Sequence, residues 1–176
     1  MTPSTATLNQ LEAKVIIQAL VDYGIEHISI SPGSRSTPLT LAAASEPRLQ
    51  KHVHFDERGL GYFSLGIAKA TQKPTALIVT SGTAVANLLP SVIEAYYAYV
   101  PLVILSADRP PELLDCGANQ SIDQKHLLGK YAKFEHLPCP ESLEMITPIP
   151  ERILRGILAH GPVHFNCAFR EPLYEH

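Results

Sequence analysis

A carboxylate stands where a strand-like segment passes into a helix-like segment. The apolar run Lys51–Phe55 is followed directly by the helical pattern Glu57–Thr71, with Glu57 at the junction. A carboxylate at the C-terminal end of a strand lies on the edge where open α/β sheets bind ligands, so Glu57 is a candidate for proton chemistry. The alternative is that Asp56 or Glu57 only caps the helix and complements its positive N-terminal end. The local pattern is compatible with both interpretations.

Two further segments carry groups that could hold an anion. Ser31–Pro38 (SPGSRSTP) places the hydroxyls of Ser34 and Ser36 around the guanidinium of Arg35, just before a predicted helix start. A second candidate arginine, Arg109, follows an apolar strand-like run. Guanidinium groups pair well with carboxylates, so two of them on one ligand-binding edge predict carboxylate substrates. The alternative for the serine-rich segment is a tight turn with an exposed arginine.

The segment Thr80–Ala84 (TSGTA) follows another apolar run and resembles a phosphate-binding turn. It lacks the Gly-x-x-x-x-Gly-Lys-Ser/Thr spacing, and the sequence contains no Gly-x-Gly-x-x-Gly and no Gly-x-Ser-x-Gly. These absences disfavour a nucleoside triphosphate site, a dinucleotide site and a serine hydrolase.

Composition indicates one folded domain. The chain has 176 residues, of which 45% are hydrophobic and 18% charged, enough for a single core. A net charge of -3 without a basic cluster argues against nucleic-acid binding. No run approaches the ~18 apolar residues of a membrane span. The cysteines are odd in number and widely spaced, which favours reduced thiols in a cytoplasmic protein: Cys116, Cys139 and Cys167.

A metal site formed by this chain alone is not expected. His52 and His54 alternate along a predicted strand and therefore share a face, but neither has a Cys, Asp or His partner at a metal-binding spacing.

Helical and strand-like patterns alternate along the chain. A capping box at Asn9 and Glu12 predicts a helix that ends at Gly24, and Thr37 with Pro38 predicts a second helix start. The other predicted helices are Glu57–Thr71, Gly82–Tyr99 and Glu151–His160, the predicted strands are 25–31, 51–55, 75–80, 101–107, 131–137 and 163–169, and the predicted linker is Pro138–Pro150. This order predicts an α/β fold with an open, mostly parallel sheet and helices on both faces.

Five segments together resemble one family of enzymes. They are Ser31–Leu39, Phe55–Gly61, Val79–Asn87, Ala107–Leu113 and Cys116–Gln120, and the similarity continues through Glu171–Tyr174. In combination they resemble the N-terminal part of the MenD family, the thiamine-diphosphate-dependent 2-succinyl-5-enolpyruvyl-6-hydroxy-3-cyclohexene-1-carboxylate synthases of menaquinone biosynthesis. The resemblance implies that residues 1–176 form a single pyrimidine-binding domain of a longer transferase.

The resemblance also implies a reaction and roles for residues. The family decarboxylates 2-oxoglutarate on thiamine diphosphate, with Mg²⁺ or Mn²⁺, and adds the succinyl carbanion equivalent to isochorismate. Glu57 matches the catalytic glutamate that hydrogen-bonds the aminopyrimidine ring. The positions matching cofactor contacts are Glu57, Ser81, Gly82, Thr83 and Asn87, and those matching the substrate pocket are Ser34, Arg35, Ser36, Arg109, Asn119 and Gln120.

One part of the family pattern is missing from this sequence. The diphosphate-binding domain, with its Gly-Asp-Gly and downstream Asn motif for the metal ion, has no counterpart before His176. The resemblance therefore implies a composite site shared with the diphosphate-binding domain of a partner subunit, in a homodimer or homotetramer, and an inactive fragment in isolation. Two alternatives stay open: another thiamine-diphosphate enzyme, such as an acetolactate-synthase relative, and a stand-alone α/β binding or regulatory module.

Overall fold

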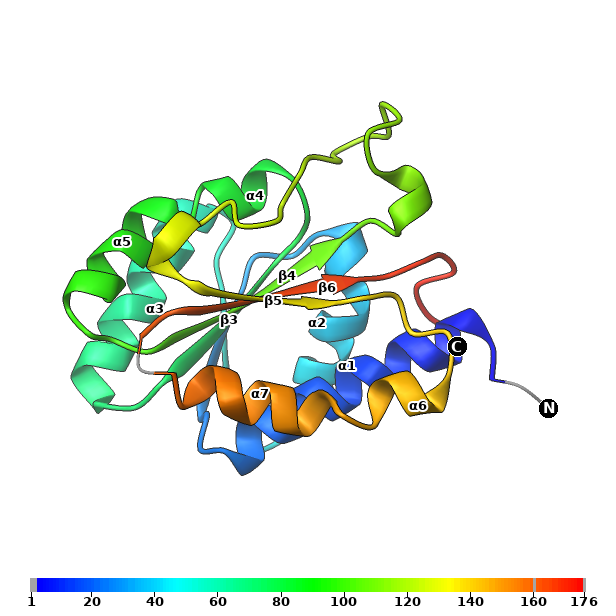
Figure 1. Ribbon diagram of the computed structural model, residues 1–176. Coiled ribbons are helices and arrows are strands. Elements are labelled where there is room, and N and C mark those ends of the chain that lie inside the picture. The colour runs from blue at the N-terminus through cyan, green and yellow to red at the C-terminus, as the bar shows by residue number, and fades with distance from the viewer. Residues whose placement is uncertain (1–2, 160, 176) are drawn as a thin grey trace.

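The computed structural model describes residues 3–159 and 161–175. At its centre is a six-stranded sheet in the order β2-β1-β3-β4-β6-β5, in which every pair is parallel (Figure 1). The strands are β1 His27–Ile30, β2 Gln50–Val53, β3 Thr75–Val79, β4 Leu102–Asp108, β5 Lys133–Leu137 and β6 Val163–Ala168. The predicted open parallel sheet is confirmed, and because every strand runs in one direction, all the strand C-termini lie along one edge.

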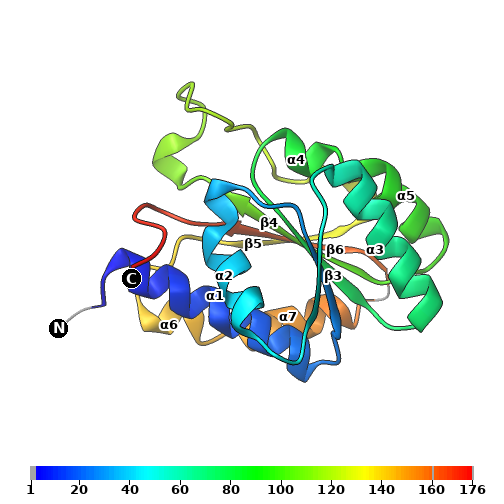
Figure 2. The same ribbon diagram turned by 180° about the vertical axis from the view of Figure 1, so that it is seen from behind.

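Helices cover both faces of the sheet, as predicted. One face carries α1 Thr5–Asp22, α2 Thr37–Ser45, α6 Leu143–Ile146 and α7 Ile149–Ile157, and the other carries α3 Glu57–Thr71, α4 Thr83–Ala86 and α5 Leu89–Tyr97 (Figures 1 and 2). Short 3₁₀ turns lie at Ser34–Ser36, Pro111–Leu113 and Gly129–Tyr131. The two ends of the described chain meet, since Ser4 Oγ donates to Glu175 Oε1 at 2.6 Å.

The apolar central strands account for the helical layer on each face of the sheet. Every residue of β3 (TALIV) and β4 (LVILSAD) is buried, as expected of strands covered on both faces. The edge strand β2 (QKHV) is partly exposed along its whole length. The sheet separates two hydrophobic clusters, one under each helical layer.

The predicted capping box at the first helix is wrong. The helix starts at Thr5, where Ser4 Oγ accepts a hydrogen bond from the Thr7 N–H and acts as the N-cap. Asn9 and Glu12 are instead buried inside the helix. Asn9 Nδ2 donates to the carbonyl oxygens of Arg170 (2.8 Å) and Pro172 (3.0 Å), so this side chain fixes the C-terminal segment.

The predicted strands differ from the observed ones by one or two residues at their ends, and two other predicted segments differ more. The predicted helix Gly82–Tyr99 is two helices, because Pro90 has no N–H to continue the hydrogen-bond ladder from α4. The predicted linker Pro138–Pro150 contains α6 and the first two residues of α7, which ends at Ile157. The predicted end of that helix, His160, lies outside the described residues.

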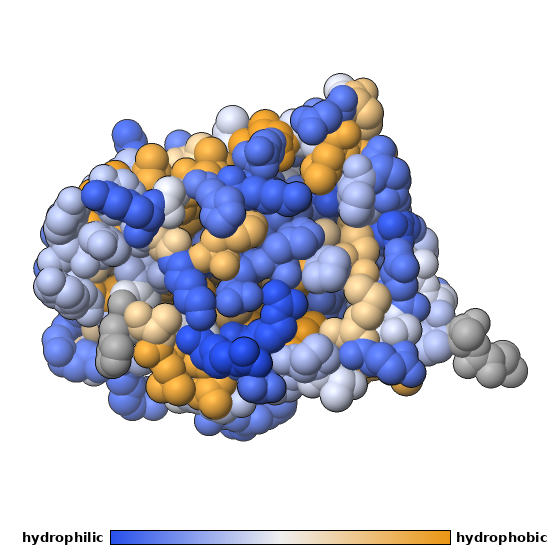
Figure 3. Space-filling view, viewed as in Figure 1, coloured by the Kyte–Doolittle hydropathy of each residue, from blue (hydrophilic) through white to orange (hydrophobic). Residues whose placement is uncertain are grey.

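The surface over β5 and α7 is mainly hydrophilic, with apolar side chains in small separate areas, one of them over α7 (Figure 3). Among the described residues, no helix is both long enough and apolar enough to cross a membrane.

Candidate functional site at the C-terminal edge of the sheet

The loops that follow β1, β2 and β3 are in direct contact. Ser31 N–H donates to the Ile78 carbonyl at 2.9 Å, and Ser31 Oγ donates to the Phe55 carbonyl at 3.5 Å. Gly33 lies so close to the next loop that an added Cβ would be 2.4 Å from Cβ of Thr80. The three loops therefore form one continuous surface beside the strand ends, where open α/β sheets bind ligands.

Glu57 is the first residue of α3, and it is not the helix cap. Asp56 is the N-cap: its carboxylate oxygens accept hydrogen bonds from the N–H groups of Arg58 and Gly59, each at 3.2 Å. Glu57 is half-buried, and among the described residues its carboxylate has no hydrogen bond or ion pair. Of the two interpretations open in the sequence, capping belongs to Asp56, and Glu57 is left available to a ligand.

The Ser81–Thr83 turn joins β3 to α4. Ser81 and Gly82 are buried, whereas Thr83 is exposed at the helix start. Gly82 has φ +81°, a conformation that favours glycine. Asn87 follows α4, one turn after Thr83, with its side chain exposed and free of hydrogen bonds to the described residues. The turn and Asn87 therefore lie together in the structure, and their role in cofactor binding stays a prediction.

Arg109 and Gln120 both contact this turn. Arg109 Nη1 donates to Ser81 Oγ, and Ser81 Oγ donates to the Gln120 carbonyl at 3.1 Å. Gln120 Nε2 in turn donates to the Ser81 carbonyl at 2.9 Å. Asn119, next to Gln120, is exposed. The structure thus brings the predicted substrate residues of the loop after β4 onto the predicted cofactor turn.

Arg35 and Arg109 are electrostatic neighbours. Burial lowers the pKa of Arg109, and the positive charge of Arg35 lowers it further. The carboxylates of Asp108 and Glu171 act in the opposite direction, so part of this positive charge is already balanced within the protein. A carboxylate ligand beside the two arginines stays a prediction.

Arg35 is more deeply engaged within the protein than the sequence suggests. It is 6% exposed, Nη1 donates to the Phe169 carbonyl at 3.0 Å, and Nη2 forms an ion pair with Glu171 at 2.8 Å. It is therefore not the exposed turn arginine of the alternative interpretation. Ser36 is also buried, and its hydroxyl donates to the Gly33 carbonyl at 3.0 Å, whereas Ser34 is exposed.

Sequence reasoning missed a buried polar network beneath the site. Ser106 Oγ contacts His164 Nε2 (2.7 Å) and Asn166 Oδ1 (2.9 Å), and Asn166 Nδ2 donates to Asp108 Oδ2 (2.6 Å). Gln124 completes the network from the loop after β4. Burial raises the pKa of Asp108, although the hydrogen bonds from Asn166 and from the Arg109 N–H counteract it. The signal in the sequence is the alternation of β6 (VHFNCA), which places His164 and Asn166 on one face.

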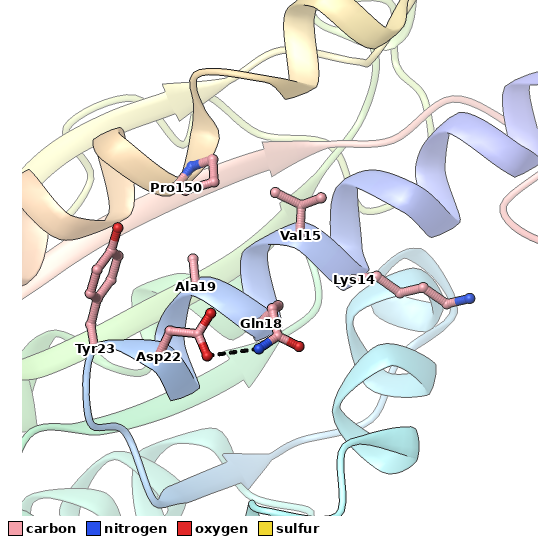
Figure 4. Close-up of a pocket in the computed structure, with 7 residues that line it drawn as sticks. All are labelled: Lys14, Val15, Gln18, Ala19, Asp22, Tyr23 and Pro150. Atoms are coloured by element: carbon pink, nitrogen blue, oxygen red, sulfur yellow. Dashed lines mark hydrogen bonds between the residues drawn. The ribbon is translucent and has the colours of Figure 1, made fainter.

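Two concavities differ in their relation to the predicted site residues. A cavity of about 200 Å³ opens beside the network, and its lining includes Asp108, Arg109, Gln124 and His136. A more open hollow of about 370 Å³ lies between α1 and the start of α7 (Figure 4), and it contains none of the predicted site residues. In that hollow Gln18 Nε2 donates to Asp22 Oδ1 at 2.7 Å along one helix. Among the described residues, no group of three His, Cys, Asp or Glu side chains could hold a metal ion.

Comparison with known proteins identifies the class of protein to which this fold and site correspond. Residues 12–127 match the family described as thiamine pyrophosphate enzyme, N-terminal TPP binding domain. The match covers more than half of the chain, which therefore belongs to this family. The predicted fold type and the thiamine-diphosphate-binding class are both confirmed.

The similar curated proteins are more specific. The chain is 52% identical over 177 residues to the 2-succinyl-5-enolpyruvyl-6-hydroxy-3-cyclohexene-1-carboxylate synthase of Shewanella putrefaciens, covering 98% of this chain and 30% of that protein. It is 54% identical to the synthase of the same name from Shewanella sediminis, covering 97% of this chain and 30% of the relative. The chain thus spans about 30% of the length of these relatives, and the resemblance to the MenD family is confirmed.

Proposed function

We propose that residues 1–176 are the N-terminal pyrimidine-binding domain of a 2-succinyl-5-enolpyruvyl-6-hydroxy-3-cyclohexene-1-carboxylate synthase. The enzyme is a transferase of menaquinone biosynthesis that uses thiamine diphosphate and Mg²⁺ or Mn²⁺ to decarboxylate 2-oxoglutarate and transfer the succinyl unit to isochorismate. The observation that carries the proposal is the 52% identity along 98% of the chain to enzymes of that name.

The residues at the strand ends fit the pyrimidine end of the cofactor. Glu57 has a half-buried carboxyl group that no described residue contacts by a hydrogen bond or ion pair. Such a group can form a hydrogen bond with a ring nitrogen and transfer a proton. Ser81 and Gly82 form a buried turn held by Gln120 and Gln124, and Thr83 and Asn87 are exposed beside it, where a ligand can reach them. When bound, thiamine diphosphate supplies the electron sink that decarboxylation needs.

The arginine-bearing loops provide the substrate specificity in this proposal. Arg109 and Gln120 contact Ser81, and Arg35 adds positive charge next to Arg109. 2-Oxoglutarate has a second carboxylate that pyruvate lacks, and isochorismate is also an anionic acid. A guanidinium pair at the site therefore favours the dicarboxylate over pyruvate. Ser34 and Asn119, both exposed on the same loops, complete the proposed substrate pocket.

Exposed apolar side chains near Glu57 support a composite site. Phe55 is 86% exposed and Val53 65% exposed on the edge strand, and Tyr62 and Phe63 are 47% and 44% exposed on α3. The edge strand and α3 are neighbours, since the rings of His52 and Phe63 lie 5.2 Å apart. Large exposed apolar side chains on neighbouring elements are typical of a surface that another domain covers. We assign the covering domain as the diphosphate-binding domain of a partner subunit in a homodimer or homotetramer, located in the cytoplasm. This domain would hold the metal ion, and the present chain alone would be inactive.

The test is substrate preference of the enzyme that contains this chain. With thiamine diphosphate and Mg²⁺, mass spectrometry should detect the succinylated product from 2-oxoglutarate and isochorismate, and pyruvate should compete poorly. Preferential use of pyruvate would instead support an acetolactate-synthase relative. If thiamine diphosphate does not bind at all, the chain belongs to a binding or regulatory module and the proposal fails.

A further inference from the structure

The peptide bond between Ser81 and Gly82 is held on both sides by glutamine side chains from one loop. Gln120 Nε2 donates to the Ser81 carbonyl at 2.9 Å, and the Gly82 N–H donates to Gln124 Oε1 at 2.7 Å. Gly82 also packs tightly, since an added Cβ would lie 2.9 Å from Cγ of Gln120. The orientation of this peptide is therefore set by two side chains that come from a distant part of the sequence.

Gln124 differs from Gln120 in being fully inside the protein. It is 1% exposed, although it lies in an irregular segment between β4 and β5. Its Nε2 donates to the Ala107 carbonyl at 3.1 Å and to Asn166 Oδ1 at 2.7 Å. The amide orientation is fixed by its partners, because the Gly82 N–H can only donate and the Ala107 carbonyl can only accept. Gln124 thus links the Ser81–Gly82 turn to both β4 and β6.

Burying an amide among strands is favourable only when its polar atoms find partners. The oxygen and both hydrogens of the Gln124 amide find them here. An apolar residue of the same size would fill the space but would release the Gly82 N–H from its partner. The side chain therefore has a geometric role that packing alone does not explain.

We propose that Gln124 is a positioning residue that holds the Ser81–Gly82 turn in the conformation that receives thiamine diphosphate. The inference rests on the proposed function, because the turn is assigned to the cofactor there. Through Gln124 and Gln120, the loop that carries Arg109 and the cofactor turn become one unit. The position of the turn therefore also sets the position of the substrate loop.

The test compares Gln124→Met with Ser106→Ala in the enzyme that contains this chain. Gln124→Met keeps the volume but removes all three hydrogen bonds of the amide. Ser106→Ala is the matched control, because it removes buried hydrogen bonds to His164 and Asn166 in the same network without touching Gly82. We expect Gln124→Met to raise the Kd for thiamine diphosphate, measured by calorimetry, by about tenfold or more, the equivalent of one buried hydrogen bond.

Ser106→Ala should lower Tm while leaving that Kd within about twofold of wild type. If Gln124→Met does not fold, Gln124→Asn carries the same expectation, since it withdraws the amide from Gly82 by one methylene. If the Gln124 variants bind thiamine diphosphate with the same Kd as the wild type, the inference is overturned, whether or not their Tm is lower. A wild type that binds no thiamine diphosphate would instead refute the proposed function, so the two failures are distinguishable.

Discussion

The buried carboxyl group of Glu12 predicts an unusual dependence of stability on pH. Glu12 lies in α1, is 2% exposed, and has one oxygen, Oε2, without a hydrogen-bond partner among the described residues. Burial raises its pKa from 4.5 to about 8, although the positive charge of Arg152 acts in the opposite direction. Between pH 4.5 and 8 the folded protein therefore retains a proton that the unfolded chain has released.

This difference makes the free energy of unfolding fall as the pH rises through that interval. Each unit of pKa difference corresponds to about 1.4 kcal/mol, so the raised pKa of Glu12 costs at most about 3 kcal/mol at pH 7. Above pH 8 the cost reaches its full value of at most about 5 kcal/mol, because the carboxylate is then buried in its charged form. Below pH 4.5 the cost vanishes, since both states are protonated.

The substitution that tests this reasoning is Glu12→Gln, which matches the shape of the neutral acid. Urea unfolding followed by circular dichroism at pH 5, 7 and 8.5 should show a stability gain over wild type that is small at pH 5 and grows to pH 8.5. Glu94→Gln, on the exposed face of α5, is the matched control and should show no such trend. A difference between Glu12→Gln and wild type that is independent of pH would refute the reasoning.

Two further predictions concern buried and site residues. Burial lowers the pKa of His164 from 6.5 to about 4, so unfolding should become easier as the pH falls from 6.5 to 4, and NMR should show its ring titrating near pH 4; titration near pH 6.5 would contradict this. In the enzyme that contains this chain, Arg109→Lys should lower kcat/KM for 2-oxoglutarate by more than about tenfold with Tm unchanged. Arg35→Lys should lower both kcat/KM and Tm, because one ammonium group cannot replace the bonds to Phe169 and Glu171. A lower Tm in Arg109→Lys, or an unchanged kcat/KM in both variants, would remove the basis for a carboxylate site.

The sequence predicts the architecture because its strongest patterns reflect burial. The continuous apolar runs of β3 and β4 are typical of central strands, and their alternation with helices favours a parallel sheet. The pattern at Asn9 and Glu12 misled because polar residues at capping spacing can also be buried inside a helix. The partners of Asn9, in the C-terminal segment, are more than 150 residues away in the sequence.

The site was predictable to the extent that its residues follow strand ends. Glu57 and Arg109 follow β2 and β4, and the parallel sheet brings such positions to one edge. Gln124 could not be found in this way, because a glutamine in a polar loop looks like a solvent-exposed residue until tertiary contacts bury it. Which of Asp56 and Glu57 caps the helix likewise depends on the residue at which α3 starts, and the local sequence pattern does not resolve this.

The central claim is that Glu57 supplies proton chemistry to thiamine diphosphate, and exchange of the proton on the thiazolium carbon tests it most directly. In the enzyme that contains this chain, Glu57→Gln should slow this exchange, measured by NMR in deuterated solvent with cofactor bound, by about 10²–10⁴-fold. Asp56→Asn, the matched control at the helix cap, should leave the rate nearly unchanged. An exchange rate in Glu57→Gln equal to that of the wild type, with cofactor fully bound, would contradict the account.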